Sequence, residues 1–222
     1  MKILDIASKL KTIKETLPKD VTLVAVSKTK PESDILEAYK AGQRVFGENK
    51  IQEMVQKYEA LPKDIQWHMI GHLQRNKVKY MAHFVSLIHG VDSLKTLKEI
   101  NKQALKHKRI INCLLQAKIA QEDTKFGLSF NEIETILNSE ELKTLKNIAI
   151  VGLMGMASFT DNLEQVEKEF TNLNTFFLNL KSQISNLKFL SMGMSGDYQI
   201  AIKCGSNMVR IGSSIFGERH YI

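Results

Sequence analysis

Cysteine, proline and long apolar runs are all scarce in this sequence. Its two cysteines, Cys113 and Cys204, have neither another cysteine nor a histidine at metal-site spacing. That excludes a disulfide framework and a cysteine-based metal centre, and we expect two reduced thiols in or near the core. No apolar run approaches the ~18 residues of a membrane-spanning helix, so the sequence predicts no membrane partner.

Targeting and linker patterns are equally absent. Charged residues interrupt segment 1–17 every few positions, so it lacks the apolar stretch of a signal peptide. With the reduced cysteines, this leads us to expect a cytoplasmic protein. The 3 prolines and 12 glycines form no linker-like stretch. We therefore expect a single domain over residues 1–222.

The charge balance is basic, with 31 Lys+Arg against 24 Asp+Glu and a formal net charge of +7. A basic surface attracts nucleic acids or anionic metabolites. The lysines, however, are scattered along every predicted helix, with no arginine-rich run and no interleaved aromatic residues. We expect no nucleic-acid partner and keep nucleic-acid binding as the third hypothesis.

Apolar runs and amphipathic segments alternate eight times along the chain, after an amphipathic helix expected over 4–17. The apolar runs are typical of parallel strands covered on both faces, and they occupy 21–29, 44–49, 65–71, 84–91, 111–119, 148–156, 188–194 and 208–217. Segments with helical periodicity occupy 31–42, 50–61, 76–83, 93–108, 130–139, 161–184 and 197–205.

Eight strand–helix units in a chain of this length predict an α/β fold, a (β/α)8 barrel of the TIM type with an extra N-terminal helix. An open doubly wound sheet is the competing arrangement, since it needs no pairing between the first and last strands. Three predicted helices begin at residues with the spacing of a capping box, namely Ser129 with Glu132, Asp161 with Glu164, and Asn49 with Gln52.

Lysine follows the first predicted strand directly, in the sequence VAVSKTK (24–30). Burying an ammonium group is costly, so such a lysine reaches solvent, pairs with an anion, or gives up its proton and can then form a Schiff base. Strand alternation puts Lys28 on the same face as Val24, and Arg210 on the same face as Gly212. Because the first and last strands of a barrel are neighbours, both cations are expected to point toward one cavity.

Two nearby cations require an anionic or lysine-consuming ligand. The sequences GMSGD (193–197) and IGSS (211–214) offer backbone N–H groups and serine hydroxyls. Asp197 opens a short helix whose N-terminus favours an anion, and phosphate sites after strands seven and eight are frequent in this fold. A lysine beside a phosphate cup is what pyridoxal phosphate needs, although strand-end glycines can equally be turn residues.

Six motifs at or near strand ends carry a family resemblance: VAVSKTKP, FGENKIQE, WHMIGHLQRNK, GLMGM, LSMGMSGDYQIAI and MVRIGSSIFG. With them the sequence resembles the pyridoxal phosphate homeostasis proteins, from about residue 21 to the C-terminus. The resemblance implies a barrel of the alanine racemase N-terminal kind that binds pyridoxal 5′-phosphate (PLP) through a Schiff base. It also implies the cofactor-binding residues: Lys28 as the Schiff-base lysine, Ser195, Gly212 and Ser213 at the phosphate, Arg210 beside the pyridine ring, and Asn49 lining the cofactor.

Other ionisable residues near these motifs have simpler interpretations. We expect Lys30 to be a solvated loop lysine, with an anion contact as the alternative. We expect His68 to be a buried core histidine, with an acid or base role as the alternative. Glu48 either pairs with a nearby cation or faces water. His72 stands where many members of the family have proline, and we expect it at the surface or the rim of the site.

Two features distinguish a carrier from an enzyme. A cationic Arg210 beside the pyridine nitrogen keeps that nitrogen unprotonated and the ring a weak electron sink. Two-base racemisation needs an acid–base group on each face, and alanine racemases take one from a second domain. Since the chain ends at Ile222, we expect that domain to be missing.

We therefore expect a PLP-homeostasis protein with no catalytic residues and no dedicated turnover, which buffers PLP or delivers it to apo PLP-dependent enzymes. The alternative is a low-activity PLP-dependent amino-acid racemase. No exposed heptad seam is visible, so we expect a monomer.

Overall fold

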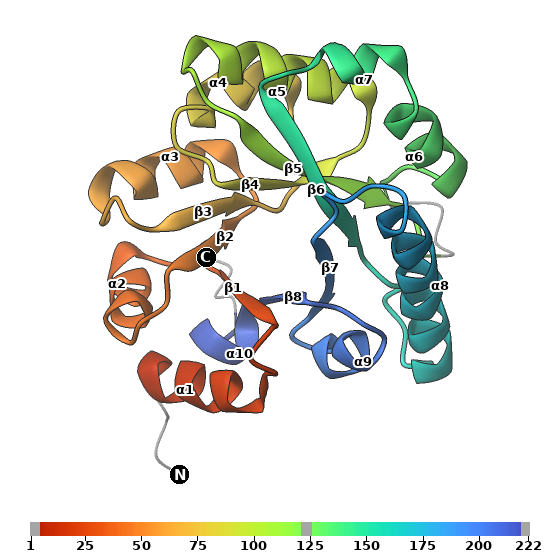
Figure 1. The fold of residues 1–222 in the computed structure, drawn as a ribbon. Coiled ribbons are helices and arrows are strands. Elements are labelled where there is room, and N and C mark those ends of the chain that lie inside the picture. Colours follow the sequence, from red (N-terminus) through yellow and green to blue (C-terminus); the bar gives the residue numbers. More distant parts are fainter. Residues whose placement is uncertain (1–4, 121–125, 219–222) are drawn as a thin grey trace.

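Eight parallel strands close into a barrel in the computed structural model, which describes residues 5–120 and 126–218 (Figure 1). The strands follow one another around the barrel in sequence order. They are β1 (Thr22–Val26), β2 (Val45–Glu48), β3 (Gln66–Met69), β4 (Leu87–Val91), β5 (Ile111–Ala117), β6 (Ile148–Gly155), β7 (Phe189–Met194) and β8 (Met208–Ile211).

Closure depends on the pairing of β1 with β8, in which Thr22 lies opposite Met208 and Ala25 opposite Ile211. This pairing confirms the predicted barrel, and the open doubly wound sheet is wrong. The apolar strand composition has its expected cause, because both faces of the strands are covered. The outer face packs under helices and the inner face lines the barrel interior.

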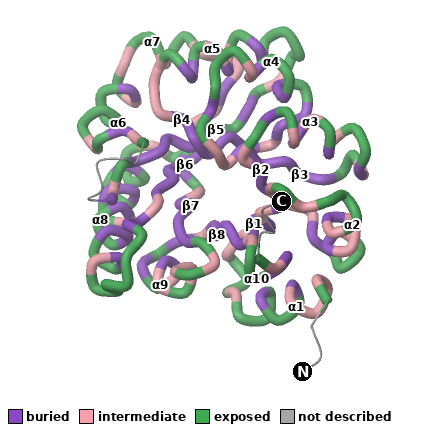
Figure 2. Tube along the Cα trace, turned by 180° about the vertical axis from the view of Figure 1, so that it is seen from behind, coloured by how far each residue is buried: buried purple, intermediate pink, exposed green. Residues whose placement is uncertain are grey.

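Helices form an outer layer, with buried residues on their inner sides and exposed residues outside (Figure 2). The extra N-terminal helix is α1 (Ile6–Thr16), and its first turn is capped by Asp5, which accepts the Ser8 N–H. The others are α2 (Glu32–Lys40), α3 (Ile51–Ala60), the 3-10 helix η1 (Arg75–Lys77), α4 (Val78–Met81), α5 (Leu94–Lys106), α6 (Phe130–Leu137), α7 (Glu140–Thr144), α8 (Leu163–Lys181), α9 (Tyr198–Lys203) and α10 (Ser213–Phe216).

Capping follows the sequence prediction at one helix of three. The Ser129–Glu132 capping box is present at α6. The prediction for Asp161 is wrong, because Asn162 caps α8 one residue later and accepts the Gln165 N–H. The prediction for Asn49 is also wrong, since α3 begins after Lys50 and has no side-chain cap.

The last strand is shorter than its apolar run. It ends at Ile211, not at residue 217, because the chain turns at Gly212 into α10. The N–H groups of Ile215 and Phe216 both bond to the Gly212 carbonyl, so residues 213–216 satisfy their polar groups as a helical turn. This turn moves Gly212 and Ser213 from a strand to the rim of the barrel.

Apolar side chains cover both faces of the barrel sheet. The main core lies between strands and helices and includes the fully buried Trp67, Phe46 and Phe170. A smaller cluster from five strands can meet only inside the barrel, and it contains Val24, Leu87, Leu114, Val151, Met154 and Met208. Both cysteines are buried free thiols, as expected. Among the described residues, no helix is long and apolar enough to cross a membrane.

Candidate functional site

A cavity of about 310 Å³ opens at the carboxyl ends of the strands. The structure brings all six residues predicted for the cofactor site to its wall: Lys28, Asn49, Ser195, Arg210, Gly212 and Ser213. Apolar side chains, among them Val26, Ile70 and Met156, complete the lining. The predicted meeting of Lys28 and Arg210 at one cavity therefore has a direct geometric basis in the β1–β8 pairing.

A second hollow of about 550 Å³ adjoins this cavity at Asn49. Its walls include Lys50 and His72, from the loops after β2 and β3, and Lys77 of η1. Neither Lys28 nor Arg210 reaches it. We therefore place the candidate site in the smaller cavity, where Lys28 and the buried Arg210 meet.

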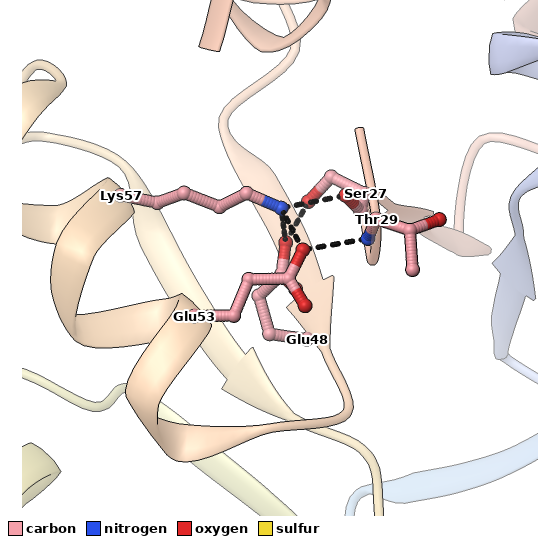
Figure 3. A network of polar contacts seen from close by, with 5 residues as sticks. All are labelled: Ser27, Thr29, Glu48, Glu53 and Lys57. Atoms are coloured by element: carbon pink, nitrogen blue, oxygen red, sulfur yellow. Dashed lines mark hydrogen bonds and ion pairs between the residues drawn. The ribbon is translucent and has the colours of Figure 1, made fainter. Parts of the chain in front are cut away.

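The loop that carries Lys28 is tied to α3 by a buried ammonium group (Figure 3). Lys57 Nζ donates to the carbonyl of Ser27 at 2.7 Å, to Glu48 Oε1 at 2.8 Å and to Glu53 Oε1 at 2.7 Å. These three bonds use all three ammonium protons. Lys57 is buried, and these partners compensate its lost hydration.

Glu48 completes the cluster from the end of β2. Its carboxyl group is fully buried and accepts the Ser27 hydroxyl at 2.6 Å. Among the described residues, its second oxygen has no partner. Burial raises the pKa of Glu48 to about 7, although Lys57 and Ser27 lower it in part. Of the two expectations for Glu48, pairing with a cation is confirmed and exposure to water is wrong.

Arg210 is held inside the barrel by neutral groups. Its Nη1 donates to the carbonyl of Ser191 at 2.9 Å and to Ser191 Oγ at 2.6 Å, and its Nη2 donates to the Gly155 carbonyl at 3.1 Å. Burial lowers the pKa of Arg210 to about 10, and the nearby charge of Asp197 offsets part of that effect. At neutral pH the guanidinium therefore keeps its charge and directs it at the cavity.

Two histidines extend this network across the barrel. Ser191 Oγ, which accepts from Arg210, also lies 3.0 Å from His89 Nδ1. His89 Nε2 lies 3.0 Å from His68 Nδ1, and the tautomers of the two rings set which atom donates in each contact. Burial lowers the pKa of His68 to about 3 and that of His89 well below its usual range, so both rings are neutral.

The expectation that His68 is a core histidine is confirmed, whereas His89 and Ser191 were missed. Strand alternation places each on the inner face of its strand. It cannot show that β4 and β7, which are not neighbours, bring these side chains together across the barrel interior.

The loops after β7 and β8 meet where a phosphate was expected. Ser195 Oγ accepts the N–H of Gly212 at 3.2 Å and so links the two loops. Gly193, at the end of β7, has φ +94°, and an added Cβ would lie 2.6 Å from Cβ of Ala201. Only glycine fits that turn, and the turn brings the loop that carries Ser195 over the cavity.

Lys30 and His72 have specific partners. Lys30 lies in a loop and is half-exposed, as expected, and its Nζ also donates to the carbonyls of Phe216 at 2.9 Å and Glu218 at 3.0 Å. It joins the Lys28 loop to the end of α10. His72 is exposed, as expected, with Nδ1 3.6 Å from Asp92 Oδ2.

Comparison with known protein families gives one match across nearly the whole chain. The model of the alanine racemase N-terminal domain matches residues 3–220. A pyridoxal phosphate homeostasis protein of Pasteurella multocida is 40% identical over 206 residues, covering 90% of this chain and 88% of that protein. The protein of the same name from Escherichia coli is 36% identical over 208 residues, covering 92% and 88%.

Solved structures agree with the fold. PipY of Synechococcus elongatus, a member of the COG0325 family, superposes without PLP at a TM-score of 0.90 and with PLP bound at 0.86. It is 34% identical, and the match covers 96% of this chain and 100% of PipY. Alanine racemase of Clostridium difficile shares the fold, with a TM-score of 0.81 at 16% identity, over 57% of its own chain.

Proposed function

This chain belongs to the family of pyridoxal phosphate homeostasis proteins, and on that premise we propose that it binds PLP as a Schiff base on Lys28 and buffers or delivers it. One observation carries the proposal. The same 310 Å³ cavity is lined by a lysine, by a charged arginine, and by two loops that contribute serine and glycine residues. These groups come from the ends of three different strands. The PLP-bound structure of PipY supports the same ligand class.

The donor set of the cavity fits a phosphorylated pyridine aldehyde. When bound, PLP supplies an aldehyde carbon that forms a reversible imine. Lys28 would supply the amine for that imine. Ser195, Ser213 and the Gly212 backbone would hold the phosphate through charge-assisted hydrogen bonds. Arg210 would serve as a donor beside the ring nitrogen, and Asn49 would line the ring.

The hydrogen-bond partners of Arg210 favour storage of PLP over catalytic turnover. Arg210 has no carboxylate among its hydrogen-bond partners in the described residues, and it remains a donor at neutral pH. A pyridine nitrogen that accepted from Arg210 would stay unprotonated, and the ring would then be a weak electron sink. His68 has a pKa of about 3 and is a poor base near neutrality. We propose a monomeric cytoplasmic carrier for apo PLP-dependent enzymes, in preference to a low-activity racemase.

Binding of PLP and of pyridoxal, which lacks the phosphate, tests this assignment. A charge-assisted hydrogen bond contributes about 1.5–3 kcal/mol, so loss of several lowers affinity by about a hundredfold or more. In equilibrium titrations of the wild-type protein we expect this difference between the affinities for PLP and for pyridoxal. It should shrink in Ser195→Ala and persist in the exposed control Ser182→Ala. Equal affinity for PLP and pyridoxal would contradict the phosphate cup.

A further inference from the structure

The peptide that carries Lys28 is bound on both sides by one cluster of charged side chains (Figure 3). On one side Lys57 Nζ donates to the carbonyl of Ser27 at 2.7 Å. On the other side Glu53 Oε1 accepts the N–H of Thr29 at 2.6 Å. Lys57 and Glu53 are themselves joined at 2.7 Å, so a single unit fixes the residues before and after the lysine.

Thr29 shows that this fixation overcomes a local preference. Its φ is +63°, in the left-handed region that β-branched residues rarely adopt. Such a conformation persists only where surrounding contacts impose it. The hydrogen bond from the Thr29 N–H to Glu53 is positioned to impose this conformation. It acts on Thr29, the residue next to Lys28.

We infer that Glu53 and Lys57 are positioning residues for Lys28: they act through the Ser27–Thr29 peptide to aim the amine into the cavity. Neither Glu53 nor Lys57 lines the cavity that contains Lys28 and Arg210. Both belong to α3, on the outer side of the barrel. They therefore act on how the Lys28 amine approaches its reaction partner in the cavity. The inference rests on the proposed Schiff base, and it adds the residues that set the geometry of that reaction.

Glu53 allows a test that keeps two of the three hydrogen bonds of Lys57. It is partly exposed, and its removal leaves Lys57 bonded to Ser27 and Glu48. Glu53→Ala removes the acceptor of the Thr29 N–H, whereas Glu53→Gln keeps an oxygen at the same place. Glu59→Ala, at an exposed position of the same helix, is the matched control.

The measurement is the rate at which the visible Schiff-base absorption appears after PLP is mixed with each apo-protein, beside the affinity for inorganic phosphate. Small misplacements of a reacting group lower rates by ten- to a hundredfold. We expect Glu53→Ala to slow Schiff-base formation by about tenfold or more with unchanged phosphate affinity. Glu53→Gln should recover most of the rate, and Glu59→Ala should match wild type.

A wild-type rate in Glu53→Ala would overturn the inference. So would an equal loss of phosphate affinity, which would indicate general damage to the site, or an equal loss of rate in Glu53→Gln. Absence of any Schiff base in the wild-type protein is a different result, because it would contradict the proposed function itself.

Discussion

Burial moves the pKa of several side chains far from their usual values, and it brings the pKa of Glu48 close to neutral pH. Its carboxyl group has a pKa of about 7 in the folded protein, against 4.5 for an exposed glutamate. The groups that face it are Lys57, Ser27 and Glu53. Folding therefore favours protonated Glu48, and ionising it in place costs free energy.

Because of this raised pKa, the free energy of unfolding decreases as the pH rises. A raised folded-state pKa gives stability that is complete below about pH 4.5 and is lost as pH rises through about 7. The shift corresponds to on the order of 3 kcal/mol. Urea denaturation should show wild type losing about that much between pH 4.5 and 8 relative to Glu48→Gln. Parallel pH profiles for the two proteins would contradict the account.

Lys28, Arg210 and the serine loops could be predicted from sequence because Arg210 lies in the last strand and the others follow a strand, and the strands of a barrel place their ends together. The partners of these residues could not. Lys57 bonds to Ser27 because of how α3 packs on the outside of β2, and His89 meets Ser191 only across the interior. Such contacts depend on the packed three-dimensional structure, and no local pattern encodes them.

Among the elements, helix starts show where a local pattern is enough and where it is not. Ser129 and Glu132 form the capping box that their spacing predicts. At α8 two polar residues, Asp161 and Asn162, stand in succession, and the chain uses the second. Sequence spacing gives the presence of the helix and leaves its first residue uncertain by one position.

This difference gives a stability prediction for two similar substitutions. Removal of an N-cap side chain costs about 1 kcal/mol. We expect Ser129→Ala to lower the free energy of unfolding by about that amount, and Asp161→Ala to leave it nearly unchanged. Chemical denaturation of both variants measures this. A larger loss for Asp161→Ala would contradict the assignment of Asn162 as the cap.

The whole molecule combines an apolar barrel interior with one polar layer near its mouth. The pairing of β1 with β8 brings Lys28 beside Arg210, and the link between Ser195 and Gly212 closes the loops over the same space. The rhythm of eight strand–helix units was enough to predict this closure. The end of β8 was not, because an apolar run continues through Gly212 into a helical turn.

The most direct test of the central claim is chemical trapping of PLP on Lys28. PLP is added to the wild-type protein, to Lys28→Ala and to the control Lys50→Ala, which changes an exposed lysine nearby. Each sample is reduced with borohydride and digested, and the modified peptide is identified by mass spectrometry. We predict a pyridoxyl adduct on Lys28 in wild type and control, and loss of the reducible visible band in Lys28→Ala. The same reducible band in Lys28→Ala, or an adduct on another lysine in its place, would contradict the account.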